Sequence, residues 1–120
     1  MDEEEDRMQT INENAKEYRF GESGPKYLMR GPKVDFGLVR LLPGEDFPNH
    51  YHTVVEEDFF ILEGEIDFVI NGETAYHAVP GDLVHVPPPE THYLKNNGNV
   101  PAKAAFVKAP CKPGDRIDLK

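Results

Sequence analysis

Residues 44–64 read GEDFPNHYHTVVEEDFFILEG and contain the most informative chemistry of the chain. His50 and His52 are two residues apart, a spacing that places both imidazoles on the same face of a strand. Glu57 follows five residues after His52. Two histidines alone are ordinary on a polar strand face. Because neutral imidazole combined with a carboxylate suits divalent transition metals, these side chains together are candidate metal ligands.

The sequence on both sides of this segment consists of short apolar runs separated by turn residues. In residues 65–70, apolar side chains alternate closely with mostly polar ones, the pattern of a half-buried strand. Asn71-Gly72 follows and predicts a type I′ hairpin turn. Pro87-Pro88-Pro89 cannot donate sheet hydrogen bonds and predicts a loop or an edge. Strands are predicted at 36–42, 58–62, 65–70, 74–79, 83–86, 91–95 and 102–108.

Composition is consistent with a single all-β domain. The chain has 120 residues, enough for one hydrophobic core, and its 11 prolines and 10 glycines lie between the apolar runs. No long helical pattern appears after residue 20. A closed antiparallel barrel or jelly roll fits this pattern, because closure protects the strand edges.

Charge and cysteine content exclude several classes of function. The net charge of −9 disfavours nucleic-acid binding, since a polyanion would be repelled. No apolar stretch of about 18 residues is present, and the N-terminus is acidic where a signal peptide would be basic, so we expect a cytoplasmic protein without a membrane interaction. Cys111 is the only cysteine, which rules out an internal disulfide. The acidic run at residues 2–6 predicts a solvated tail.

The wider spacing of these residues resembles the two signature motifs of the cupin superfamily. The first motif has a glycine, five residues, His-x-His, four residues, a glutamate, six residues and a glycine, and residues 44–64 match every position. The second motif is matched by Gly81, Pro87, His92 and Asn96. One departure is Pro89, where many members have glycine; it leaves the spacing to His92 unchanged. The resemblance covers roughly residues 34–110.

This resemblance implies a double-stranded β-helix, or jelly-roll barrel, that holds one divalent metal ion (Fe, Mn, Ni or Zn). Residue by residue, it implies the ligands His50, His52, Glu57 and His92. Glu56 competes with Glu57, because the family tolerates three or four residues after the second histidine; only Glu57 keeps six residues before Gly64. The asparagine of the second motif usually serves structure in this family.

Other candidate residues follow from strand parity. Phe59 and Ile61 share the parity of Glu57, and Phe106 and Lys108 share one face of the last predicted strand. Phe59, Phe106 and Lys108 are therefore candidate substrate-binding residues. The alternatives are that the phenylalanines only pack in the barrel core and that Lys108 is a surface lysine whose charged end reaches solvent. His77 and His85 have no counterpart among the family's ligands and are expected on the outer face or at a subunit interface.

The expected domain organisation is an acidic N-terminal segment, residues 1–25, followed by a barrel at 26–115 with a C-terminal extension to 120. By the resemblance, the function is that of a metal-dependent enzyme acting on a small oxygenated molecule through dioxygenase, isomerase or lyase chemistry. The alternative is a non-catalytic module that binds a small molecule or a sugar. The sequence singles out no catalytic acid or base, and many relatives of this size form homodimers, which is the expectation here.

Overall fold

The computed structural model describes residues 7–48 and 50–118 of the chain. The acidic run at residues 2–6 lies outside these ranges. Within these two ranges, apart from a short 3-10 turn at Glu13–Ala15, the regular secondary structure is entirely β. Across the described ranges, no helix has the length and apolar character needed to cross a membrane. The strands are β1 Gly24–Arg30, β2 Asp35–Leu41, β3 His50–His52, β4 Glu56–Glu63, β5 Ile66–Ile70, β6 Glu73–Ala78, β7 Leu83–Val86, β8 His92–Lys95, β9 Ala102–Ala109 and β10 Arg116–Asp118.

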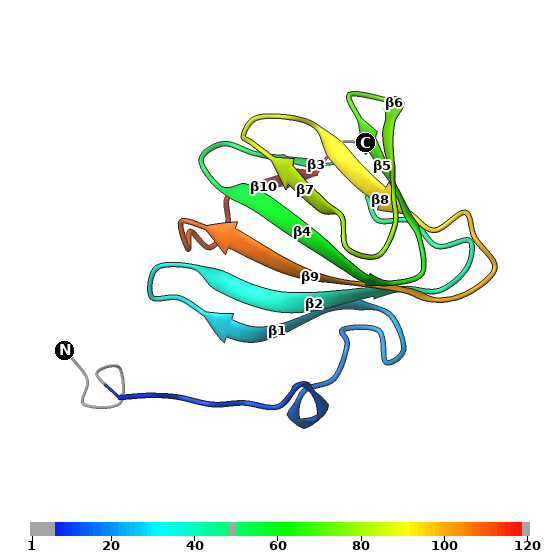
Figure 1. Cartoon of the computed structure of the whole chain (residues 1–120). Helices are drawn as coiled ribbons and strands as arrows, with labels where there is room; N and C mark the ends of the chain where they lie inside the picture. Colours follow the sequence, from blue (N-terminus) through cyan, green and yellow to red (C-terminus); the bar gives the residue numbers. More distant parts are fainter. Residues whose placement is uncertain (1–6, 49, 119–120) are drawn as a thin grey trace.

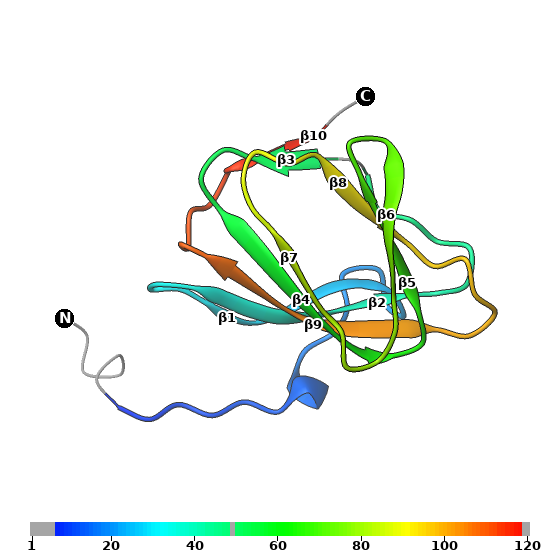
Figure 2. The ribbon, with the colours of Figure 1, turned by 45° about the horizontal axis from the view of Figure 1, so that its top comes forward.

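The strands form two five-stranded sheets that face each other (Figure 1). One sheet has the order β1-β2-β9-β4-β7, and the other has the order β10-β3-β8-β5-β6. All neighbours in both sheets are antiparallel. In the view of Figure 2, β3 and β10 lie side by side at the top of the barrel, above β4 and β9. The predicted all-β jelly-roll fold is therefore confirmed.

A single apolar core fills the space between the sheets. In β4, buried Phe59 and Ile61 alternate with the exposed side chains of Phe60 and Leu62, as the period of a strand requires. The core draws on both sheets, so burying these side chains fixes which face of each strand turns inward. Its largest fully buried apolar side chains are Leu41, Ile61, Ile66, Phe68 and Leu94.

All seven predicted strands are present, with ends that differ by at most two residues. The predicted hairpin turn is also present, since Asn71 and Gly72 have φ angles of 51° and 82°, the positive values that a type I′ turn needs. The triple proline lies in the loop between β7 and β8, as expected. The sequence did not reveal β1 or β10, which add an outer strand to each sheet, and it indicated β3 only through the spacing of His50 and His52.

Gly64 shows why the family motif ends in glycine. It has a φ of 69°, and a Cβ at this position would lie 2.5 Å from the carbonyl oxygen of Pro101 and 2.8 Å from the Cα of Ala102. No side chain fits there, because the turn after β4 contacts the start of β9. The glycine thus allows the strand that carries Glu57 to pack closely against its neighbour.

Candidate metal centre and adjoining cavity

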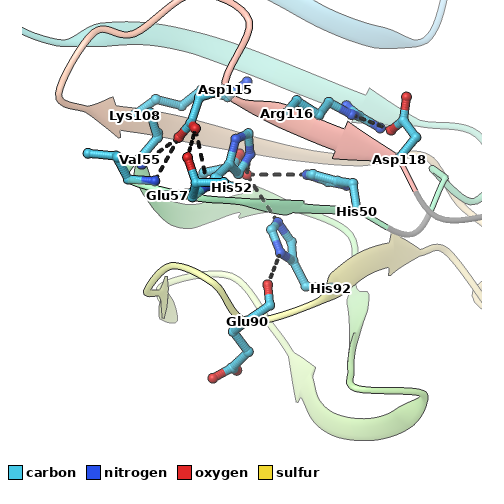
Figure 3. Close-up of polar contacts among 12 residues, drawn as sticks. His50, His52, Val55, Glu57, Glu90, His92, Lys108, Asp115, Arg116 and Asp118 are labelled. Atoms are coloured by element: carbon cyan, nitrogen blue, oxygen red, sulfur yellow. Dashed lines mark hydrogen bonds and ion pairs between the residues drawn. The ribbon is translucent and has the colours of Figure 1, made fainter.

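Three strands bring His50, His52, Glu57 and His92 together inside the barrel (Figure 3). β3 carries His50 and His52 on its inward face, and the antiparallel β8 places His92 directly opposite His50. Glu57 points inward from β4 in the other sheet. These four residues have exposed fractions of only 1% to 5%, so solvent is largely kept from them. We call them the buried cluster.

The donor atoms of the buried cluster converge on one point. The Nε2 atoms of His50, His52 and His92 lie 3.3, 2.6 and 3.1 Å from the Oε1 atom of Glu57. All four donor atoms lie within 4.8 Å of one another, an arrangement that could hold a metal ion. Three imidazoles and one carboxylate suit a divalent first-row metal and leave about two octahedral positions open.

Hydrogen bonds on the far side of two rings fix the tautomer that metal binding requires. The Nδ1 atom of His50 lies 3.0 Å from the carbonyl oxygen of Pro48, and the Nδ1 atom of His92 lies 3.1 Å from that of Glu90. A carbonyl only accepts, so both Nδ1 atoms carry the proton and donate. The Nε2 atoms then face Glu57: a protonated ring can donate from Nε2 to this carboxylate, whereas a neutral ring presents a lone pair that a cation between these atoms would accept. The Nδ1 atom of His52 is buried and has no partner within the described residues.

Burial sets the charge state of the cluster. Burial lowers the pKa of His50, and contact with Glu57 offsets this only in part, so the ring is neutral near pH 7. Burial also raises the pKa of Glu57, but contacts with three imidazoles and the charge of Lys108 outweigh it and hold the pKa well below its usual range. A neutral imidazole at His50 and an ionised carboxylate at Glu57 are the protonation states in which these two side chains bind metals.

A carboxylate far away in the sequence, that of Asp115, holds the turn that joins β3 and β4, the strands that carry His50, His52 and Glu57. Asp115 accepts hydrogen bonds from the amides of Thr53, Val54 and Val55 at 3.2, 2.9 and 2.8 Å, and from the Thr53 hydroxyl. Burial raises the pKa of Asp115, but these hydrogen bonds outweigh it and hold the pKa far below its usual range. Immediately after Asp115, β10 pairs with β3 along its whole length. The C-terminal segment therefore positions both His50 and His52.

A cavity of about 330 Å³ adjoins the buried cluster, within the size range of small-molecule sites. His50 and Glu57 open into it. Its wall is mostly apolar, and its polar residues other than the cluster are cations, one acid and one tyrosine. The side chains that line it include Arg19, Tyr27, Val39, Phe47, Phe59, Leu94, Phe106, Lys108, Arg116 and Asp118.

The three residues predicted to bind substrate all line this cavity. Phe59 and Phe106 form part of its apolar wall, and Lys108 lies at its polar side. Ile61, which shares their parity, instead lies in the core, 1% exposed. Sequence reasoning missed Tyr27, because β1 gave no clear strand pattern, and it missed Arg116 and Asp118 because a three-residue strand has no readable periodicity.

Residues with the same chemistry as the cluster lie elsewhere. Glu56, the competing carboxylate, is exposed on the outer face of β4, near His85. His77 and His85 are about half exposed, which confirms their expected place on the outside of the barrel.

Cys111 is not set up as a nucleophile. A hydrogen bond to Asp35, together with some burial, raises the pKa of the Cys111 thiol and so disfavours the reactive thiolate.

Asn96 has the structural role expected from the second motif. Its side chain is fully buried, and its amide nitrogen donates to the carbonyl oxygens of Leu41 and Val100 at 3.0 and 2.9 Å. Its side-chain oxygen accepts from the amide of Gly98 at 2.9 Å. One side chain thus connects β8 to the end of β2 and to the loop before β9, well away from the donor atoms of the cluster.

Known proteins with similar sequences include enzymes of polyketide synthesis. The tetracenomycin polyketide synthase protein TcmJ of Streptomyces glaucescens is 31% identical over 77 residues, which cover 64% of this chain and 51% of that protein. Polyketide synthase CurC of Streptomyces cyaneus is also 31% identical over 77 residues, covering 64% of this chain and 49% of that protein. The chain spans about half the length of these curated relatives.

Solved structures share the fold over nearly the whole chain. A double-stranded β-helix protein from Klebsiella pneumoniae superposes with a TM-score of 0.81 at 19% identity, covering 95% of this chain and 99% of that one. The polyketide cyclase RemF from Streptomyces resistomycificus superposes with a TM-score of 0.80 at 18% identity, covering 95% and 87%. At these identities the likeness shows the fold alone.

Residues 37–108 match the family model of the cupin domain. The matched segment is more than half of the 120 residues and contains the whole buried cluster and most of the apolar wall of the cavity. Both sheets of the barrel and the spacing of the two motifs agree with that match. The chain therefore belongs to the cupin family.

Proposed function

We propose that this protein is a metal-dependent enzyme acting on an oxygen-rich small molecule, with His50, His52, Glu57 and His92 as the ligands of one divalent metal ion. The observation that carries the proposal is the convergence of three imidazole nitrogens and one carboxylate oxygen within 4.8 Å, buried at the end of a cavity. Perturbed titratable groups that converge in a cavity are the usual mark of a functional site.

Each part of the site has a role in this proposal. A metal held by the cluster supplies a Lewis acid for a carbonyl or hydroxyl oxygen of the substrate. The carbonyls of Pro48 and Glu90 hold two imidazole rings in the binding tautomer. The apolar side chains of Phe59 and Phe106 keep water from the reacting oxygen, which strengthens every electrostatic interaction around it.

The relatives support a polycarbonyl or phenolic substrate. Two of them are named as polyketide synthase proteins, and a mostly apolar cavity wall suits compounds of that kind better than a free sugar. With such a substrate, loss of a proton next to a polarised carbonyl would lead to isomerase, cyclase or lyase chemistry. Dioxygenase chemistry is the other branch, and it would consume oxygen.

Proton exchange of a simple dicarbonyl compound tests the proposal. Metal-loaded protein should accelerate exchange of the central hydrogens of acetylacetone in deuterated buffer, followed by NMR, and His92→Ala protein should not. An oxygen electrode assigns the branch, since only dioxygenase chemistry consumes oxygen in proportion to substrate. If metal-replete protein turns over no dicarbonyl, uronate, sugar or catechol compound, the enzymatic proposal is wrong.

One observation favours the alternative, a non-catalytic binding module. Among the described residues that line the cavity, Asp118 is the only carboxylate or imidazole outside the buried cluster, and it pairs with Arg116 at 2.7 Å. A dedicated general base is therefore not evident in the cavity wall. Reversible binding of a ligand that is recovered unchanged, with the metal in place, would support this module in place of the enzyme.

The homodimer expected from the resemblance stays a prediction. Phe60, Leu62 and Leu83, on the outer face of the β4 and β7 sheet, have exposed fractions of 45%, 41% and 64%, and such neighbouring apolar side chains suit a subunit contact. Light scattering should give twice the chain mass of 13.6 kDa. A concentration-independent mass of one chain would contradict it.

A further inference from the structure

Lys108 is a cation inside the cavity with no ion-pair partner among the described residues. It lies directly opposite Glu57 in the antiparallel pairing of β9 with β4, so its side chain shares the inward face with the buried cluster. Asp35 lies opposite it on β2, yet no ion pair forms between them. A half-buried ammonium group that forms no ion pair is stabilised by an anion that enters the cavity beside it.

Tyr27 and Lys108 both line the cavity and together offer hydrogen-bond donors to it. The ammonium nitrogen of Lys108 donates to the Tyr27 hydroxyl oxygen at 2.7 Å. Because that oxygen is already accepting, the hydroxyl hydrogen is left to donate to another acceptor. The remaining N–H groups of Lys108 are also donors. The pair of Lys108 and Tyr27 therefore has N–H and O–H donors that an acceptor atom of a bound ligand would complete.

The aromatic ring of Tyr27 is held in place from two sides. The guanidinium of Arg30 lies 3.7 Å from the centre of the ring, and the edge of the ring meets Phe106 at 5.2 Å between centres. Phe106 in turn packs over Gly37, where a Cβ would lie only 2.5 Å from its ring. This packing gives the donor pair a defined position, as a recognition site needs.

The charges around the cavity have the opposite sign to the protein as a whole. Although the net charge is −9, the cavity is lined by the cations Arg19, Lys108 and Arg116. Asp118 is paired with Arg116. The charge of Glu57 interacts with Lys108 but also faces the three imidazoles of the buried cluster, and neither Lys108 nor Arg19 forms an ion pair among the described residues. A cationic cavity in an acidic protein attracts anions and repels cations.

The cavity wall next to Lys108 and Glu57 is aromatic. Phe59 and Phe106 lie on the neighbouring strands β4 and β9 with ring centres 6.5 Å apart, and Phe47 lines the cavity with them. Flat apolar surfaces of this kind contact an aromatic ring better than a hydrated sugar. The cavity therefore combines an aromatic wall, a cation and a candidate metal centre.

We propose that Lys108 and Tyr27 form an anion-binding site that selects aromatic substrates carrying a carboxylate, phenolate or enolate group. The anionic oxygen accepts from Lys108 and Tyr27, the aromatic body lies against Phe59 and Phe106, and a further oxygen faces the buried cluster. This proposal rests on the proposed function for the role of that last oxygen. Lys108 thereby determines specificity by charge.

Calorimetric titration with salicylate and its neutral amide, salicylamide, tests this site. Zinc-loaded full-length protein should bind salicylate at least about tenfold more tightly than salicylamide, as expected for a charge-assisted hydrogen bond. Lys108→Met should abolish this preference and leave salicylamide binding almost unchanged, whereas Lys108→Arg should keep most of it. Tyr27→Phe should weaken salicylate binding about fivefold. Lys112→Met, at an exposed lysine outside the cavity, is the matched control.

The outcomes separate this site from the metal centre. A preference for salicylate that survives Lys108→Met would overturn the anion site, because the metal or another cation would then be responsible. Equal binding of both compounds to unaltered protein would overturn it as well, even if the variants failed to fold. Repeating the titration with metal-free protein tests the anion site separately from the proposed function. If the protein takes up no zinc but still prefers salicylate to salicylamide in a way that depends on Lys108, the enzyme proposal is wrong and the anion site stands.

Discussion

Histidines and carboxylates meet in two kinds of place in this protein, with opposite consequences. In the buried cluster, three imidazoles face one carboxylate, and burial lowers the pKa of His50. On the outer surface, both ring nitrogens of His77 face carboxylates, Asp67 at 2.5 Å and Glu65 at 3.0 Å. Hydrogen bonds to those two acids raise its pKa. The imidazoles of the buried cluster could therefore donate lone pairs to a metal ion. The exposed imidazole of His77 instead keeps its proton to a higher pH.

Removing one inward-facing ligand should have the largest effect. His52→Ala should weaken the binding of zinc by more than about 100-fold, since even residues that only support a ligand change metal affinity by 10- to 100-fold. The matched control is His85→Ala, which removes an exposed imidazole that hydrogen-bonds to Asp58. Competition with a chromophoric chelator measures both. Equal losses in the two variants would show that exposed and buried histidines do not differ.

The next effect in size concerns the turn between His52 and Glu57. Asp115→Asn removes the charge that accepts hydrogen bonds from three consecutive residues, so unfolding in urea should show a loss of about 2 kcal/mol. Zinc affinity should fall by about tenfold, because His52 and Glu57 lose their fixed positions. Asp118→Asn, at the other end of this short C-terminal segment, is the control and should change stability much less. A stable Asp115→Asn protein with full zinc affinity would contradict the role given to Asp115.

The lowered pKa of Asp115 should make the stability of the fold depend on pH. Its pKa in the folded protein lies below the unfolded value of about 3.9. It therefore stabilises the fold fully above about pH 4, and this stabilisation is lost as the pH falls toward the folded value. Urea unfolding at a series of acidic pH values should show that the Asp115→Asn protein loses less stability in this range than the unaltered chain. Parallel losses in both would exclude this carboxylate as the cause.

The smallest effect expected is a difference in histidine titration. In metal-free protein, NMR should show that His77 and His85 keep their protons above the ordinary pKa of about 6.5, and that His50 loses its proton below it. The exposed histidines therefore stabilise the fold below about pH 6.5, and this contribution fades as the pH rises through their folded pKa values. His50 acts the other way and destabilises the metal-free fold as the pH drops below about 6.5. Identical titration of all three would contradict the contrast.

Much of the fold could be predicted because it depends on local patterns. Alternation in residues 65–70, the Asn71-Gly72 turn and the proline loop before His92 each follow from the chemistry of a few neighbouring residues. The positions of the four cluster residues followed from motif spacing, and the structure brings all four together. Strand parity also placed Phe59, Phe106 and Lys108 on the inward face.

The rest depends on contacts between distant parts of the chain. Asp115 reaches the amide of Thr53 across 62 residues, and no pattern near either residue indicates that contact. Lys108 and Tyr27 are 81 residues apart and meet only because β1 pairs with β2 and β2 pairs with β9. Local patterns predict which residues face inward, but only the pairing of strands decides which of them meet.

Elemental analysis tests the central claim, that the inward-facing cluster is a metal site, most directly. The protein is purified without added metal or an affinity tag and analysed by mass spectrometry beside a His50→Ala, His92→Ala double variant. The account predicts about one equivalent of a divalent transition metal in the unaltered protein and none in the variant. Absence of metal from both samples, with no uptake by the unaltered protein on titration, would contradict it.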